Sequence, residues 1–359
     1  MKRSKLAKYH KLSLCISIFI IAVVVFSGCT KSGSKSSPNA NPSVYVVGYE
    51  TENGKAISWV DGVKKDLSGL PDEVNSFSIF NGKIYAAGFM NVSKEIIKPS
   101  YSVDGSKKEL PLKQAKGYEV YGAVEDIIVS DGKVYAHGFE GVYIPNAGVV
   151  SGSSVWVDGA EGKSVAKNFD SMGLQVISFA VSNGKDYLLL YNGDINIPNP
   201  YLCYLVNEKE TRLQGGAEAN AKSIVVNNGK VYVAGRYKKA GLNKACYWED
   251  GKLIELPGGT ASRATSIAVD GSNIYVSGYY YDGINKACYW INGVKTDLDG
   301  GAVSGAVAET DKLPIALANG KVYIAGNIFL NNNKKACYWV DGKRVDLPGG
   351  VKAVAIEVY

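Results

Sequence analysis

Histidine is scarce in this chain: there are two among 359 residues, and His10 lies in the segment ahead of Cys29. Cysteine pairs with the spacing of zinc sites are missing, which disfavours a structural or catalytic zinc centre. The sequence also lacks the Gly-x-Ser-x-Gly, His-Glu-x-x-His and P-loop patterns that mark common catalytic and nucleotide sites. We therefore expect no metal and no other cofactor, and a non-catalytic protein is favoured over an enzyme.

A surplus of charge is also missing once the N-terminus is set aside. The formal net charge of +6 depends on five basic residues in the first 11 positions. Without them, 35 basic residues face 34 acidic ones. A nucleic-acid partner calls for clustered surplus cations. We expect no nucleic acid to bind.

A long hydrophobic run occurs at residues 12–26, and its 15 residues fall short of the roughly 20 that span a membrane. The residues that follow, Phe26-Ser27-Gly28-Cys29, resemble the lipobox of bacterial lipoproteins. The resemblance implies a signal peptide at 1–28 and a lipid such as palmitate on Cys29. It also implies anchorage outside the cytoplasm, at the outer membrane or cell surface. An uncleaved signal anchor is the alternative. Residues 30–43, rich in Ser, Asn, Lys and Pro, are typical of a flexible tether.

One unit is repeated seven times in the remaining residues, 44–359. Its most visible part is Tyr-x-x-Gly, which starts at Tyr45, Tyr85, Tyr135, Tyr232, Tyr275 and Tyr323, with a copy at Tyr187 that lacks the Gly. The starts lie 40 to 52 residues apart, as expected for propeller blades of four strands. Twelve Asn-Gly or Asp-Gly pairs separate apolar runs and predict two-residue hairpin turns. The sequence therefore predicts an all-β, seven-bladed propeller with four antiparallel strands, A to D, per blade.

The first unit lacks a strand A, because the chain enters it at strand B with Val44. The chain ends in an apolar run, residues 354–357, that matches a strand A. We expect this C-terminal strand to pair with the first blade and close the ring, which removes two exposed sheet edges. An open solenoid with capped ends is the alternative. We expect the propeller to be monomeric.

Two columns of strand C carry large or reactive side chains. One column holds Trp59, Trp156, Trp248, Trp290 and Trp339, and the other holds Cys203, Cys246, Cys288 and Cys337. Recurrence at one place per blade indicates a core between blades rather than a carbohydrate platform. Cysteines in equivalent positions of neighbouring blades lie too far apart for disulfides, so we interpret them as buried small hydrophobic residues. His137, in strand B, is interpreted as a satisfied structural histidine rather than a general base.

The turns also give the predicted disc two unlike faces. A–B and C–D turns lie at one end of each blade (the turn face), and the longer, more varied B–C and D–A loops lie at the other (the loop face). Function on rigid scaffolds concentrates in loops. The candidate ligand-binding residues are therefore Tyr143, Tyr191, Arg236, Tyr237, Tyr280, Tyr281, Asp282 and Phe329. Aromatic, Arg and Asp side chains could hold a glycan or a protein segment.

Three functions fit these features. The leading one is a binding or scaffold module that contacts an envelope protein or a glycan through the loop face. The second is a secreted glycan-active hydrolase or lyase that uses Tyr or carboxylates at the channel mouth, such as Glu119, Asp282 or Asp311. The third is a structural component of an envelope complex.

The repeat unit itself, residues 231–259, resembles the repeats of bacterial propeller lipoproteins that have no assigned function. The resemblance covers residues from about 43 to the end of the chain. The unit lacks the signatures of WD40 and kelch repeats, so the functions of those families do not carry over.

Overall fold

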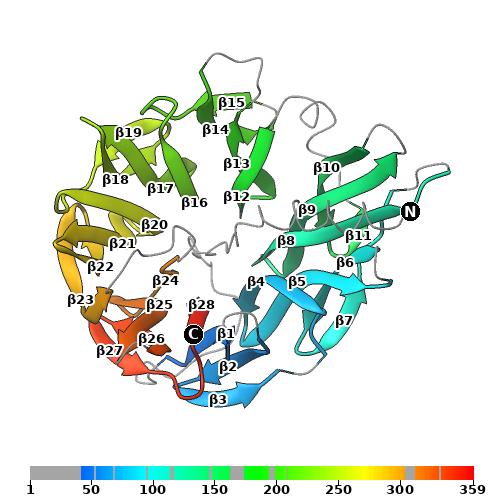
Figure 1. The fold of residues 1–359 in the computed structure, drawn as a ribbon, viewed down its shortest axis with the longest axis horizontal. Coiled ribbons are helices and arrows are strands. Elements are labelled where there is room, and N and C mark those ends of the chain that lie inside the picture. The colour runs from blue at the N-terminus through cyan, green and yellow to red at the C-terminus, as the bar shows by residue number, and fades with distance from the viewer. Residues whose placement is uncertain are drawn as a thin grey trace, which may run out of the picture.

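A ring of seven four-stranded antiparallel sheets makes up the computed structural model of this chain (Figure 1). The structure describes residues 42–359, except 52–53, 68, 94–95, 114–116, 145–147, 162–173, 194–198, 208, 304–311 and 331–332. The predicted signal peptide, Cys29 and nearly all of the predicted tether lie outside these residues. Among the elements described, no helix is long and apolar enough to cross a membrane.

The blades follow one another around the ring, and each is written from its innermost to its outermost strand. Blades 1 to 3 are β28 (Lys352–Val358), β1 (Val44–Tyr49), β2 (Ala56–Val60), β3 (Val63–Asp66); β4 (Glu73–Phe80), β5 (Lys83–Asn91), β6 (Ile97–Val103), β7 (Ser106–Glu109); and β8 (Val120–Ser130), β9 (Lys133–Ile144), β10 (Gly148–Val157), β11 (Ala160–Glu161). Blades 4 and 5 are β12 (Leu174–Ser182), β13 (Lys185–Asn192), β14 (Tyr201–Val206), β15 (Lys209–Arg212); and β16 (Asn220–Asn227), β17 (Lys230–Lys239), β18 (Leu242–Glu249), β19 (Lys252–Glu255). Blades 6 and 7 are β20 (Ala261–Asp270), β21 (Asn273–Asp282), β22 (Ile284–Ile291), β23 (Val294–Val303); and β24 (Ile315–Ala318), β25 (Lys321–Leu330), β26 (Asn333–Val340), β27 (Lys343–Asp346).

The first and last strands close the ring, as the sequence predicts. β28 pairs antiparallel with β1, from Val44 opposite Val358 to Tyr49 opposite Lys352. Beyond the strand ends, Ser43 N–H donates to the Tyr359 carbonyl (2.7 Å) and Tyr359 N–H donates back to the Ser43 carbonyl (3.0 Å). The prediction of seven blades with this closure is confirmed.

The C–D turns share one hydrogen-bond pattern that explains their Asp and Asn residues. In blade 5, the Asp250 carboxylate accepts a bond from Val231 N–H (2.9 Å), while Asp250 N–H donates to the Val231 carbonyl (2.8 Å). Asp61, Asp104, Asp158, Asn292 and Asp341 make the same pair of bonds in their own blades. The left-handed backbone of these residues, with φ of 46° to 52°, is one that Asp and Asn tolerate. Each turn is therefore tied to the start of strand B.

Eleven of the twelve predicted turns have positive φ at both central residues. In blade 6 the predicted Asp270-Gly271 turn is shifted by one residue: Asp270 pairs with Asn273, and Gly271 and Ser272 form the turn. Gly271 has φ of 58°, and only the first central residue then needs a left-handed backbone. Blade 4 has a further turn at Asn207, with φ of 48°. The Asn-Gly and Asp-Gly pairs did not predict it.

Seven hydrophobic clusters fill the spaces between neighbouring blades, one for each pair. Cys246 and Trp248 lie in the cluster between blades 4 and 5, whereas Tyr247 packs on the other side, between blades 5 and 6. All five Trp residues are at most 1% exposed. The four described Cys residues are free thiols and buried, and burial raises the pKa of Cys203 to about 12. The interpretation of both columns as core is confirmed for these residues.

Each Trp also fixes the loop that enters its blade from the preceding one. Trp290 Nε1 donates to the Pro257 carbonyl (2.7 Å), and Trp59 donates to Pro348 (3.0 Å). The other three indoles donate to the carbonyls of Pro111, Gln214 and Asp299. A buried indole N–H needs such a partner. The Trp column thus sets the position of four D–A loops on the loop face and of β23 at Asp299.

Candidate functional site

The Gly of the repeated Tyr-x-x-Gly lies opposite an irregularity in strand A. Strand β20 has a β-bulge between Ala264 and Ser266, where Gly278 is the partner. A Cβ added to Gly278 would stand 2.1 Å from the Arg263 carbonyl oxygen. The bulge presses the backbone of strand A against strand B, and only Gly leaves room for it. The motif therefore marks a bulge near the loop-face end of the innermost strand.

The bulge adds one residue to strand A beside the central channel. Each bulged blade has a different residue there: Val354, Asn75, Glu125, Ile177, Lys222 and Thr265. The next position along the strand repeats, with Ser76, Ser178, Ser223 and Ser266 in four of these six blades. The channel end near the loop face is thus the part of the strand-A column where the blades differ in chemistry.

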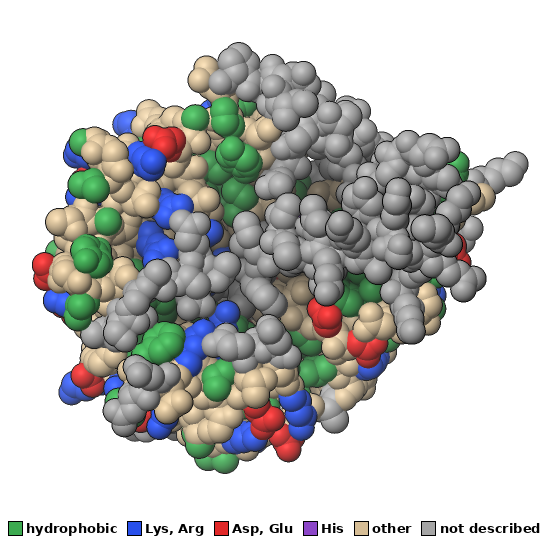
Figure 2. Space-filling model, viewed as in Figure 1, with side chains coloured by type: hydrophobic (Ala, Val, Ile, Leu, Met, Phe, Trp, Pro, Cys, Tyr) green, Lys and Arg blue, Asp and Glu red, His purple; other side chains and the backbone are tan. Residues whose placement is uncertain are grey.

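Cations occupy this end of the channel in blades 5, 6, 7 and 1. We name as the cationic mouth the partly buried residues Lys222, Arg236, Arg263, Lys312 and Lys352. Figure 2 shows Lys and Arg side chains gathered around the central hollow on the side of blades 5 to 7. Arg236 lies opposite Asn220 at the start of β16, and the Arg263 guanidinium lies 5.6 Å from the centroid of the Tyr279 ring.

Lys312 connects the two sides of the channel electrostatically. Burial lowers its pKa to about 8, the Asp126 carboxylate opposes this shift, and the cation of Lys222 adds to it. These partners belong to blades 3 and 5, whereas Lys312 stands three residues ahead of β24 of blade 7. The three side chains therefore interact across the channel.

Blade 3 contributes carboxylates to the opposite side. Asp126 is fully buried, and its Oδ1 accepts bonds from Ser76 Oγ (2.7 Å) and from Ile127 N–H (3.0 Å). Burial and the neighbouring Asp126 raise the pKa of Glu125 to about 7. Glu125 is thus poised to change charge near neutral pH.

Arg236 is the one residue of the cationic mouth that the sequence singled out. The signal that could have found Glu125 and Lys222 is their place in the repeat, because the residue two positions ahead of a recurring apolar residue of strand A differs from blade to blade. Lys312 and Asp126 carry no such signal, since their contact joins blades that are distant in the sequence.

The other predicted residues lie on the B–C hairpins, in different settings. Tyr280 is 6% exposed in the core between blades 5 and 6, and its hydroxyl donates to Asp297 Oδ2 (2.8 Å). Tyr191 is half-buried against the core between blades 4 and 5. Tyr143 belongs to β9, and its side chain lies outside the described residues. The structure does not bring the predicted residues together at one point.

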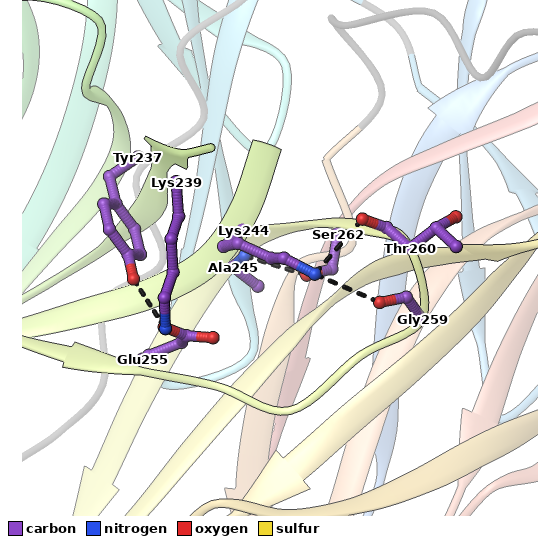
Figure 3. A network of polar contacts seen from close by, with 8 residues as sticks. All are labelled: Tyr237, Lys239, Lys244, Ala245, Glu255, Gly259, Thr260 and Ser262. Carbon is purple, nitrogen blue, oxygen red and sulfur yellow. Dashed lines mark hydrogen bonds and ion pairs between the residues drawn. The ribbon is translucent and has the colours of Figure 1, made fainter. Parts of the chain in front are cut away.

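The B–C connections of blades 5 and 6 are tight hairpins rather than the long loops that we expected. In blade 5, Ala240 and Gly241 form a turn with φ of 50° and 78°. Strands β17 and β18 pair along the whole hairpin up to this turn. Both strands continue beyond the Tyr-x-x-Gly unit, and each residue stays paired with one on the other strand as far as Lys239 opposite Leu242. Tyr237 and Lys239 on this hairpin both bind the Glu255 carboxylate (Figure 3).

The tips of these hairpins carry exposed hydrophobic side chains. We name as the apolar tips Leu242, Tyr281, Ile284, Phe329 and Leu330, which are 38% to 47% exposed on blades 5, 6 and 7. Tyr281 and Phe329 were predicted, and the other three were not. Asp282, also predicted, is exposed and pairs with Lys286 (3.3 Å).

Polar contacts hold the hairpin of blade 5 against the loop that enters blade 6. Lys244 Nζ donates to the carbonyls of Gly259 (3.2 Å) and Thr260 (3.1 Å), and Ala245 N–H donates to Ser262 Oγ (2.9 Å). Figure 3 shows Lys244 lying along this loop. The surface between the apolar tips and the cationic mouth is therefore pre-formed here.

His137 is a core residue of blade 3. It is 2% exposed, its ring centroid lies 5.8 Å from that of Phe179, and burial lowers its pKa to about 4. Among the described residues its Nε2 has no hydrogen-bond partner, so the prediction of a satisfied histidine was wrong in that respect. The structural interpretation agrees with this burial. No group of three metal-binding side chains occurs within the described parts of the chain.

No family model matches the sequence, and no curated protein matches it. Solved structures do. The propeller domain of the trilobed protease from Pyrococcus furiosus is 12% identical (TM-score 0.45) and is covered to 96% by 86% of this chain. Trypanosoma rangeli sialidase is 11% identical (TM-score 0.40; 80% of this chain, 56% of that one). Acylaminoacyl peptidase from Pyrococcus horikoshii is 14% identical (TM-score 0.45; 86% and 51%). The chain spans about half the length of the sialidase and of the peptidase. The likeness concerns the fold alone.

Proposed function

We propose that this protein is a binding module that is displayed from a lipid on Cys29 and contacts an envelope partner through its loop face. The observation that carries the proposal is the difference between the faces. One face repeats the same tight turn, and the other combines five apolar tips with the cationic mouth. Exposed apolar side chains beside charged ones on a rigid scaffold are typical of interaction surfaces.

The position of the predicted tether supports this orientation. Strand β1 starts at the turn face, because Val44 N–H bonds to Asp61 in the C–D turn of the same blade. A tether that ends at residue 43 therefore joins the disc at the turn face. Strands of 10 residues such as β21 span about 33 Å, which puts the loop face that far from the attachment point. We propose that the loop face points away from the membrane.

Matched exposed residues on the two faces provide the test of partner binding. Full-length protein in vesicles is titrated with envelope polysaccharide and envelope protein fractions, comparing wild type with Phe329→Ser and Tyr281→Ser. Val294→Ser is the control, because Val294 is 71% exposed beside a C–D turn. We expect the tip variants to weaken binding about tenfold or more and the control to bind as wild type. Equal binding by all three variants refutes the named face.

The lipid anchor has its own test. Cys29→Ser should move the protein from the membrane to the soluble fraction. In protein that keeps Cys29, a fluorophore attached at Ser272→Cys should be quenched by membrane-embedded quenchers more strongly than a fluorophore attached at Leu242→Cys. The reverse order of quenching would show that the loop face is turned toward the membrane.

One observation favours a glycan-active enzyme as the second candidate. Glu125, with its pKa near 7, stands beside Asp126 at the channel, and perturbed carboxylates of this kind are typical of general acids. Glu125→Gln should then abolish turnover in a polysaccharide panel while leaving binding intact. If the wild-type protein turns over none of the polysaccharides in the panel, the enzyme candidate is refuted and the binding function remains the proposal.

A further inference from the structure

The contact between blades 1 and 2 departs from the residue pattern of the other strand-C columns. Strand β6 of blade 2 has Ser100 in the Cys column and Ser102 in the Trp column. Every other blade has Trp or Leu at the position of Ser102. Strand β2 of blade 1 has Ser58 at a position where blades 5, 6 and 7 have Tyr247, Tyr289 and Tyr338. Three small polar side chains thus replace large aromatic or apolar ones.

All three serines point into this one contact. Trp59 of blade 1 packs against blade 7, and Tyr101 of blade 2 packs against blade 3. Because side chains alternate along a strand, Ser58 points from blade 1 toward blade 2, whereas Ser100 and Ser102 point from blade 2 toward blade 1. The three serines are at most 1% exposed. We name the contact between blades 1 and 2 the serine seam.

The three hydroxyls do not join the two blades. Ser58 Oγ donates to the Lys65 carbonyl of its own blade (3.2 Å). Among the described residues, Ser100 Oγ and Ser102 Oγ have no hydrogen-bond partner. A hydroxyl that is buried without a partner costs free energy, and serine buries much less apolar surface than Trp or Tyr. Both effects lower the free energy needed to open the serine seam, because opening returns the hydroxyls to water.

The next contact around the ring, between blades 2 and 3, is held by polar bonds and by a Trp. Ser76 Oγ donates to Asp126 Oδ1 (2.7 Å). Val129 N–H donates to Ser78 Oγ (3.3 Å). The buried Trp156 of blade 3 also donates from its indole to the loop that leaves blade 2. The serine seam lacks the indole, because a serine stands at the position of the Trp in blade 2.

Two tyrosine hydroxyls do bond across the serine seam. Tyr49 of blade 1 donates to the Val74 carbonyl of blade 2 (3.0 Å). Tyr359, which follows β28 of blade 1, donates to the Ile79 carbonyl of blade 2 (2.9 Å). An apolar cluster that includes Phe77 completes the contact. The serine seam is therefore closed in this structure, by contacts that single substitutions can weaken or strengthen.

We propose that the propeller opens reversibly at the serine seam while the other contacts between blades stay closed. Opening separates β28 from β4, the innermost strands of blades 1 and 2, and so gives the central channel an entrance from the side (Figure 1). Local openings that need less free energy than global unfolding are a general property of folded proteins. The pairing of β28 with β1 stays intact in this motion. The proposal holds whichever partner the loop face binds.

Thiol labelling of the full-length protein tests the proposal. Ser100→Cys places a thiol in the Cys column, whose natural members lie at four other contacts and serve as matched internal controls: Cys203, Cys246, Cys288 and Cys337. A buried thiol reacts only after the protein opens around it. We expect labelling at position 100 to be about 10-fold faster or more than at the natural cysteines, as resolved by peptide mass spectrometry. Equal rates at all five positions overturn the proposal.

Two further variants in the Ser100→Cys background show whether the serine seam itself sets the rate. Tyr49→Phe removes the bond to Val74 and should speed labelling about 3- to 10-fold. Ser102→Ala removes a hydroxyl that lacks a partner and should slow labelling by a similar factor. Tyr237→Phe is the matched control, because the Tyr237 hydroxyl bonds to Glu255 within blade 5. A labelling rate that neither seam variant changes overturns the proposal.

Urea separates local opening from global unfolding. Labelling at position 100 should rise with urea less steeply than global unfolding does, because opening one seam exposes less surface. An equally steep rise would show that the thiol reacts only in the unfolded chain and would overturn the proposal. If Ser100→Cys does not fold, Ser58→Cys places a thiol in the serine seam from blade 1, and the same comparison with the natural cysteines decides.

Discussion

The turn face and the cationic mouth lie at opposite ends of the same strands, and they follow opposite rules. At the turn face, six blades use an Asp or Asn to make the same two bonds to strand B. At the loop-face end, the bulged residue of strand A is different in each of the six blades that have one there. The repeated end ties together the strands of each blade, and the varied end presents a different side chain from each blade.

This difference separates stability from binding. Residues that recur from blade to blade, such as the Trp column, contact the core between blades, so their loss should lower the free energy of unfolding and leave partner binding at the loop face unchanged. Lys222 and Glu125 occupy the position that differs between blades and are only partly buried, so their loss should lower the free energy of unfolding less.

Removal of the closing strand is expected to have the largest effect on stability. Deletion of residues 351–359 removes β28, which includes the buried Val354, Ala355 and Ile356. It also exposes the edge of β1 and the core on both sides of blade 1. We expect the truncated protein to lose its cooperative thermal transition. A truncated protein that melts as sharply and as hot as the full chain would falsify ring closure as the basis of folding.

The Trp column comes next in expected effect. Trp290 is fully buried, so Trp290→Ala should cost about 3–5 kcal/mol of unfolding free energy, measured by urea denaturation. Trp290→Phe keeps most of the packing but leaves the Pro257 carbonyl without its donor, and should cost less, about 1–3 kcal/mol. Binding of the envelope partner by the loop face should be unchanged in the folded fraction. Altered affinity in Trp290→Phe would mean that the D–A loops couple the core to the mouth.

His137 offers a test with pH. Its pKa is about 4 in the folded protein against 6.5 for an exposed histidine, so the unfolded chain binds the proton more tightly. Its contribution to stability is fully present above pH 6.5 and is lost as the pH falls toward 4, by about 3 kcal/mol at most. His137→Val should remove this part of the pH dependence of urea unfolding. The same slope in both proteins would place the acid sensitivity elsewhere.

The smallest effect is expected at a single turn. Asp250→Ala removes the acceptor for Val231 N–H and leaves Ala with φ near 48°. The cost should be about 1–2 kcal/mol. Asp250→Asn should be nearly neutral, because Asn292 makes the same bond in blade 6. A neutral Asp250→Ala would show that the remaining turns hold the hairpin without this contact.

Much of the fold could be predicted because the repeat supplies local signals. The Asn-Gly and Asp-Gly pairs fix the hairpins, and the apolar run at the C-terminus identified the closing strand. The exceptions are also local. The turn of blade 6 is shifted by one residue where Gly271 and Tyr275 stand four positions apart, against three in the other units, and in blade 4 Asn207 is not followed by Gly.

The candidate site was less predictable. Aromatic residues after Tyr-x-x-Gly suggested ligand contacts, yet Tyr280 continues the strand and is buried between blades. Side chains alternate along a paired strand, so every second one points into the core. Because Tyr280 was predicted to lie in a loop, this alternation was not used to predict its burial. Arg236 was identified, whereas Lys222, Lys312 and Glu125 were not.

The sequence by itself determined the number of blades, the place of eleven turns and the way in which the ring closes, because hairpins depend on residues that are neighbours in the chain. Tertiary structure alone decided that Lys312 of blade 7 interacts with Asp126 of blade 3 and Lys222 of blade 5. Residues nearly 190 positions apart meet there because the ring brings the innermost strands around one axis. Their charges act through space, and no local pattern encodes that proximity.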